Sequence, residues 1–200
     1  MKVIITCFIT LFSLASFAQA KYESKAHGFS MNEPEGWIVA NNQDVLENLE
    51  KLDLDDAKVM KILEDRKGSL HLVSFYKYDP QTHPGLIPAI QINLRERRNK
   101  DWDTFKSTLV KSARDMGKLL EDYEFMEEPA DVKIDGIKCI YFRTKFTMKT
   151  DNGQQYRVRN RMYIIPKKDY YFQINFTDGL INEDCSAEFD KLVKSIDVKR

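Results

Sequence analysis

Three β-rich runs near the C-terminus, joined by two very short links, constrain the fold of this chain more than any other feature. The runs are Ile137 to Met148, Gln154 to Ile165 and Asp169 to Phe176, and the links contain Asp151-Asn152-Gly153 and Pro166-Lys167-Lys168. These link residues favour turns. Strands joined so closely must pair in antiparallel fashion, because a parallel pair needs a long crossover. The sequence therefore predicts an antiparallel meander.

The rest of the chain mixes strands with helices. The spacing of apolar side chains predicts strands over 28–31, 37–39, 70–78 and 86–97, and helices over 45–66, 101–120 and 189–196. Asp101 or Asp103 is the expected N-cap of the second helix. This order predicts an α+β fold in which a central antiparallel β-sheet is flanked by helices.

Residues 1–20 have the pattern of a signal peptide. Lys2 precedes an apolar run over Val3 to Leu14, and Ala18-Gln19-Ala20 forms a small-x-small cleavage site. We expect cleavage after Ala20, which leaves one domain over 21–200. The apolar run is too short for a membrane-spanning helix, so no transmembrane segment is expected after processing. The expected location is the periplasm, and the alternative is the outside of the cell.

Charge and motifs narrow the expected function. The chain has 31 basic and 31 acidic residues, and removal of Lys2 with the signal peptide leaves one more acid than base. A near-neutral balance argues against nucleic acid as the partner. The sequence has no H-E-x-x-H, C-x-x-C, G-x-S-x-G or Walker motif. We therefore predict no catalytic residue, metal ligand or cofactor, and a hydrolase with an unrecognised site is the lesser alternative.

Two cysteines, Cys139 and Cys185, remain after removal of the signal peptide. An isolated pair in an oxidising compartment is typical of a disulfide, and such a bridge would stabilise the fold by roughly 4 kcal/mol. Two buried free thiols are the alternative, since cysteine is among the most buried residue types.

Alternating arginines in the second run of the meander suggest a cationic sheet face. Arg157, Arg159 and Arg161 fall on the side opposite to Val158, Met162 and Ile164. The candidates for ligand binding on such a face are Arg95, Arg97, Arg143, Lys145, Arg157, Arg159 and Arg161. In one interpretation they are solvated or pair with the acidic 44–65 segment. In the other they bind an anionic ligand or an acidic partner.

The chain resembles the PsbP-like fold family in three segments. The stretch from Gly28 to Trp37, with Pro34-Glu35-Gly36-Trp37, is similar to the opening of the family's domain. The stretch from Asp135 to Gly179 is similar to its central meander, and Phe189 to Ile196 to its closing helix. The resemblance implies an antiparallel sheet sandwiched by helices, as in bacterial periplasmic members of the DcrB type. It implies little about activity, because fold does not determine function.

Together these features predict an exported, non-catalytic periplasmic binding or accessory protein. The expected partner is an envelope protein or an anionic small molecule that contacts the arginine-rich face. A secreted interaction protein is the alternative.

Overall fold

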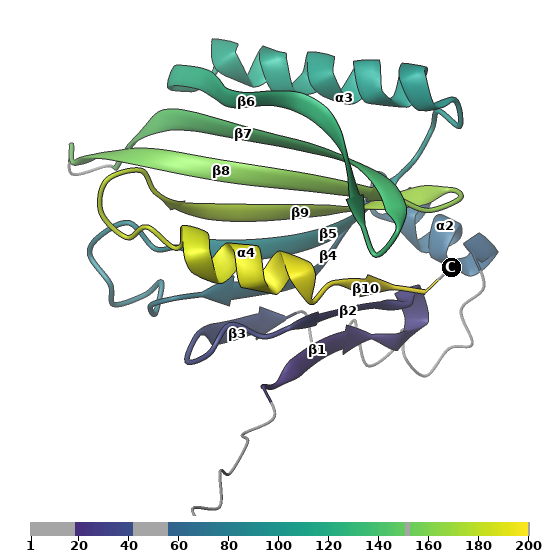
Figure 1. Cartoon of the computed structure of the whole chain (residues 1–200), viewed down its shortest axis with the longest axis horizontal. Helices are drawn as coiled ribbons and strands as arrows, with labels where there is room; N and C mark the ends of the chain where they lie inside the picture. Colours follow the sequence, from purple (N-terminus) through teal and green to yellow (C-terminus); the bar gives the residue numbers. More distant parts are fainter. Residues whose placement is uncertain (1–18, 42–55, 151–152, 200) are drawn as a thin grey trace, which may run out of the picture.

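A seven-stranded antiparallel sheet forms the centre of the structure, a computed structural model that describes residues 19–41, 56–150 and 153–199. Its strand order is β3-β4-β5-β9-β8-β7-β6 (Figure 1). The strands are β3 (Ile38–Asn41), β4 (Ser69–Tyr76), β5 (Ala89–Glu96), β6 (Glu121–Ile134), β7 (Ile137–Lys149), β8 (Gln155–Pro166) and β9 (Tyr170–Gly179). The predicted meander is confirmed as β7-β8-β9.

Helices lie on both faces of this sheet. On one face, Phe105 of α3 (Trp102–Asp115) packs against Ile140 and Phe142 of β7. The opposite face carries α2 (Asp56–Asp65), α4 (Ser186–Lys194) and a small sheet of β1 (Lys21–Ser24), β2 (Phe29–Asn32) and β10 (Asp197–Val198). Short helices η1 (Lys25–His27) and η2 (Met116–Lys118) follow β1 and α3. The α+β fold with flanking helices is therefore confirmed.

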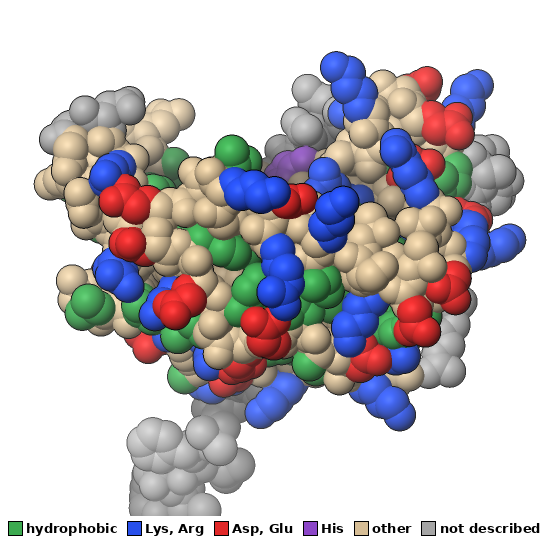
Figure 2. Space-filling view, turned by 90° about the horizontal axis from the view of Figure 1, so that it is seen from above, with side chains coloured by type: hydrophobic (Ala, Val, Ile, Leu, Met, Phe, Trp, Pro, Cys, Tyr) green, Lys and Arg blue, Asp and Glu red, His purple; other side chains and the backbone are tan. Residues whose placement is uncertain are grey.

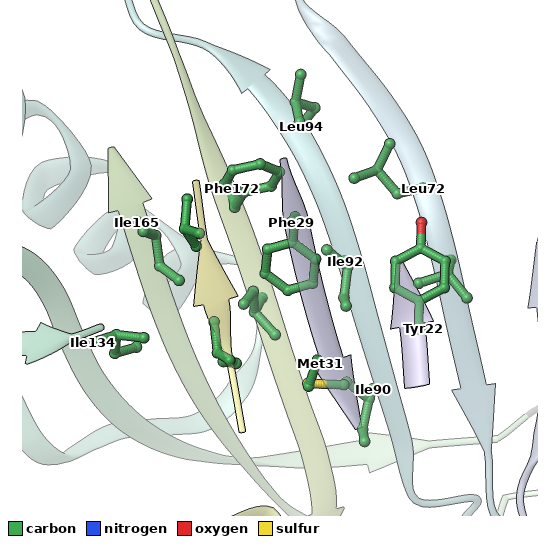
Figure 3. Close-up of a cluster of buried hydrophobic side chains, with 14 of the residues drawn as sticks. Tyr22, Phe29, Met31, Leu72, Ile90, Ile92, Leu94, Ile134, Ile165 and Phe172 are labelled. Carbon is green, nitrogen blue, oxygen red and sulfur yellow. The ribbon is translucent and has the colours of Figure 1, made fainter. Parts of the chain in front are cut away.

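The larger core lies between the two sheets. Phe29 and Met31 of β2 project among Phe172, Ile90 and Ile92 of the seven-stranded sheet (Figure 3). The rings of Phe29 and Phe172 are 4.9 Å apart. Burial of these apolar side chains holds the small sheet and α4 against the same face, and this packing positions the loop between β2 and β3 close to the start of α4.

The structure contains three strands that the pattern of apolar side chains does not predict. The largest is β6, whose sequence EDYEFMEEPADVKI is charged and contains Pro129. Its register shifts at Glu121/Glu124, Phe125/Glu127 and Glu127/Ala130 break the two-residue alternation. Pro129 is tolerated because β6 is an edge strand. The other two strands, β1 and β10, are too short for a pattern of apolar side chains, and each is defined by its pairing with β2.

Some predicted features lie outside the described residues. They are residues 1–18 of the predicted signal peptide, residues 45–55 of the helix predicted over 45–66 with the acidic residues there, and the turn residues Asp151 and Asn152. No helix within 19–41, 56–150 or 153–199 is long and apolar enough to cross a membrane.

Candidate functional site

The predicted ligand-binding cations lie on two faces of the sheet rather than one. Arg143, Lys145, Arg159 and Arg161 face α4, because Arg143 pairs with Arg161 and Lys145 with Arg159 across β7 and β8. Arg157 has the same parity and is exposed. Two others lie on the opposite face: Arg95 is paired with Tyr171, whose ring contacts Phe105 of α3, and the guanidinium of Arg97 lies 4.8 Å from the Phe105 ring. A single face with all seven cations does not form.

Buried arginines under α4 are held by a carboxylate from the neighbouring strand. Asp178 of β9 is 0% exposed and accepts hydrogen bonds from Nε and Nη2 of Arg159 at 2.9 and 2.6 Å. Nη1 of Arg161 lies 3.6 Å from the same carboxylate, and its guanidinium packs under the Phe189 ring. Asp178 also accepts the Cys185 N–H at 2.9 Å, so this carboxylate anchors the start of α4.

The remaining cations of β7 pair with the acidic edge strand. Lys145 Nζ lies 2.6 Å from Glu124, Lys149 Nζ lies 2.6 Å from Glu121, and Arg143 forms an ion pair with Glu127. The cationic face is thus largely neutralised by β6 and β9, and not by the described part of the 44–65 segment. The glutamates at positions 121, 124 and 127 recur every three residues, whereas side chains on one face of a regular strand recur every two. The sequence therefore did not indicate that these residues lie on a strand beside β7.

Figure 2 looks down on the molecule from the α3 side. Lys and Arg side chains are interspersed there with Asp and Glu, among hydrophobic and uncharged groups. Ion pairs Lys106–Asp131 and Arg114–Glu128 contribute to this mixture, with N···O distances of 2.7 and 2.9 Å. This face therefore presents no field of one sign to a charged partner.

A groove of about 960 Å³ lies where α4 begins and β2 turns into β3. Trp37 forms part of its wall, and the Trp37 ring stands edge-on to Phe189 at 6.0 Å. The Trp37 side chain also hydrogen-bonds Glu188 of α4. Further acidic and basic groups in the lining are Glu33, Glu35, Lys77, Asp184 and Lys191. Aromatic and ionisable side chains thus face the same open space, as in many ligand sites.

Two of the charged groups in the groove are already bound within the protein. Lys77 Nζ lies 2.7 Å from Glu183, and this hydrogen bond raises the pKa of Lys77. Hydrogen bonds from the hydroxyl and N–H of Ser186, and then Arg159, hold the pKa of Asp184 well below its usual range. A short loop positions Glu183 and Asp184. It needs Gly179, because a Cβ there would lie 1.7 Å from the Asn182 carbonyl oxygen.

Glu188 differs from these two groups. Burial raises the pKa of its carboxyl, although Lys77, Lys191 and the hydrogen bond from Trp37 act in the opposite direction. Glu188, Glu33 and Glu35 form no ion pair with any residue that the structure describes. The groove therefore holds three carboxylates that form no ion pair with a described residue.

Solved structures of other proteins share the fold described above. Cyanobacterial PsbP (CyanoP) from Synechocystis sp. PCC 6803 matches with a TM-score of 0.52 and 12% identity, over 92% of this chain and 95% of that one. The chain therefore has a PsbP-like fold. LpqN of Mycobacterium tuberculosis matches at a TM-score of 0.46 and 9% identity, over 93% of this chain and 88% of LpqN.

A third similar structure comes from Bacteroides thetaiotaomicron, with a TM-score of 0.46 and 14% identity. It covers 90% of this chain, which spans only 48% of the length of that protein. No protein-family model matches the chain, and no curated protein matches it significantly. The PsbP-like fold expected from the sequence resemblance is thus confirmed, and these likenesses show the fold alone.

The predicted disulfide is absent from this PsbP-like structure, in which Cys139 and Cys185 are free and buried. Cys139 precedes Ile140, which pairs with Ile164, so Cys139 lies beside Ile165 of β8. The backbone N–H of Cys185 donates to the carboxylate of Asp178, which lies beside Arg159 of the same strand β8. Arg159 and Ile165 are separated by about 20 Å along β8. A disulfide needs Cα atoms within about 7 Å, so the two thiols lie too far apart.

We expect both thiols to be reduced and protected. Burial raises the pKa of Cys139 and of Cys185 to about 11, and the thiol form is a poor nucleophile. Iodoacetamide at pH 8 should leave the native protein unmodified and should label both cysteines after denaturation without reductant. Intact-mass spectrometry measures the labels, and an unlabelled denatured protein that is lighter by two hydrogens would show that the bridge exists.

A serine, a histidine and an asparagine form a chain of contacts on the sheet face opposite to α4. Ser74 Oγ lies 3.2 Å from Nε2 of His71, whose Nδ1 lies 3.0 Å from Oδ1 of Asn93. This order of contacts is found in nucleophile–base pairs. However, Ser74 is only 2% exposed, and a substrate could not reach its hydroxyl. The contacts connect β4 to β5.

Proposed function

We propose that the protein is an exported, non-catalytic binding or accessory protein that holds its partner in the groove beside α4. The groove carries the proposal, because its Trp37 wall and three carboxylates without an ion pair to a described residue are features of recognition. Its other polar groups are poorly suited to catalysis: Lys77 and Asp184 are bound by Glu183 and Arg159, and the Cys185 thiol has a pKa of about 11.

Export is part of the same proposal. Strand β1 begins at Lys21, immediately after the predicted cleavage site, and Lys21 pairs with Asn32 of β2. Cleavage after Ala20 would therefore leave every described strand intact. The periplasm is the proposed compartment, and release from the cell is the alternative.

One fractionation experiment tests both parts in a bacterial host that expresses the full chain. We expect N-terminal sequencing of the protein from the periplasmic fraction to start at Lys21. The processed protein, immobilised and exposed to envelope extract, should retain a partner that mass spectrometry identifies. Recovery of uncleaved chain from the cytoplasm would contradict export. Recovery mainly from the culture medium would favour the secreted interaction protein.

An anionic ligand on the arginine face is a second candidate. Nε of Arg143 is buried without a hydrogen-bond partner, and Arg157 forms no ion pair with any described residue. Two tyrosines of the same face, Tyr141 and Tyr163, have ring centroids 4.7 Å apart beside Arg143. Envelope retention should then be lost in Arg143→Gln and Arg157→Gln but kept in Glu188→Gln. The opposite result would place binding in the groove.

A further inference from the structure

Residues 19 and 20 occupy one end of the groove. The Glu33 N–H donates to the Ala20 carbonyl at 2.7 Å, and Nε2 of Gln19 donates to the Glu33 carbonyl at 2.8 Å. Asn32 Nδ2 donates to Oε1 of Gln19 at 3.2 Å. Both groups of the Glu33 backbone are therefore engaged by a segment that leaves the protein if cleavage follows Ala20. The processed chain would present this N–H and carbonyl to another extended segment.

The charge of the groove indicates which segment fits. Glu33, Glu35 and Glu188 come from the β2–β3 loop and from α4, so they surround the open space from two sides. Lys191 and Lys77 are the cations among the described lining residues, and Lys77 is bound to Glu183. An acidic segment would be repelled by these carboxylates, whereas a basic one would add to the charge compensation of the partly buried Glu188.

Trp37 adds a second element of recognition. An indole ring attracts an ammonium or guanidinium group over its face, and a nearby carboxylate strengthens this attraction. The hydrogen bond between Trp37 and Glu188 holds the ring and the carboxylate together. The described residues contain no cluster of three or more metal-ligating side chains, and the carboxylates are placed around a broad groove instead.

We propose that the processed protein binds an extended, basic peptide segment of a partner protein, whose backbone pairs with Glu33 and whose Lys or Arg side chain lies over the Trp37 ring and beside Glu188. This inference rests on the proposed function of the groove and names the chemistry of its partner. The partner is recognised by alternating cations along an extended chain, and the binding weakens as salt screens the carboxylates.

Calorimetry with the protein purified from the periplasmic fraction tests this proposal. The probe is acetyl-Ala-Lys-Ala-Lys-Ala-Lys-amide, and its counterpart has glutamine in place of each lysine. We expect saturable binding of the lysine peptide only. Glu188→Gln and Glu35→Gln should each weaken this binding about tenfold, which corresponds to one carboxylate–ammonium contact of about 1.4 kcal/mol. Glu128→Gln is the matched control, because Glu128 is an exposed acid of β6 outside the groove. The affinity of this variant for the lysine peptide should be unchanged.

Several outcomes would overturn the inference. They are equal binding of the two peptides, lysine amide alone binding as tightly as the peptide, or full affinity in both glutamate variants. Trp37→Phe keeps an aromatic ring and should retain part of the affinity, whereas Trp37→Leu should lose it in a protein whose circular dichroism shows that it is still folded. If Glu188→Gln still retains its partner from envelope extract, the protein is a binding protein but the groove is not its site for a basic peptide.

Discussion

Replacing Asp178 with asparagine is expected to lower the free energy of unfolding by about 3–5 kcal/mol. Asparagine keeps the size of the side chain but removes the charge that offsets Arg159 and Arg161, whose side chains are only 8% and 3% exposed. A buried guanidinium without its carboxylate is costly, because water cannot replace the lost partner. In a protein of this size the melting temperature should fall by about 10 °C.

Asp184→Asn provides the matched comparison. Asp184 also binds Arg159, at 2.6 Å, but its side chain is 51% exposed. Solvent screens such a pair, and the oxygen of asparagine can still accept the Ser186 N–H, so the total cost should be no more than about 1 kcal/mol. Urea titration of both variants measures the difference. If Asp178→Asn lowers the free energy of unfolding no more than Asp184→Asn does, the buried ion pair is no more important for stability than the exposed one.

The Asp178 cluster also connects stability to the groove. Asp178 accepts the N–H of Cys185, the residue before α4, and α4 carries Glu188 and Lys191 into the groove. The position of this groove wall therefore depends on an ion pair within the sheet. The arginines that sequence parity assigns to a ligand face hold the helix that borders the proposed binding site.

The second large effect is a loss of stability in mild acid that comes from His27. This residue is 2% exposed, its Nδ1 contacts Ser24 Oγ at 2.7 Å, and its buried Nε2 has no hydrogen-bond partner among the described residues. Burial, and then the nearby charge of Lys167, lowers the pKa of His27 from 6.5 to about 4. The unfolded chain therefore binds a proton that the folded protein does not bind between these values.

The sign of the effect follows from this difference. The stability contributed by neutral His27 is complete above pH 6.5 and is lost progressively as the pH falls to about 4. A shift of this size corresponds to about 3 kcal/mol. Urea titrations between pH 7.5 and pH 4 should show a shallower decline in His27→Gln than in the unmodified protein. Parallel declines would mean that another group carries the acid sensitivity.

The fold was largely predictable because its strongest signals are local. Apolar alternation and the short links determine β7, β8 and β9, and the meander leaves no alternative to antiparallel pairing. The stripe containing Phe105 predicts a helix whose buried face packs on the sheet. By contrast, β6 gives little local signal, because its bulges and charged residues break the alternation. It becomes a strand by pairing its backbone with β7, and exposed ion pairs between the two strands accompany this pairing.

The sequence by itself determined the parity of Arg159 and Arg161, since adjacent strand residues must point to opposite faces. It could not determine what covers that face. Only the tertiary structure brings Asp178 and α4 over these arginines, separates Cys139 from Cys185, and puts Trp37 beside Glu188. The physical reason is that charge compensation and groove formation depend on contacts between elements far apart in the chain, whereas strand direction depends on neighbouring residues.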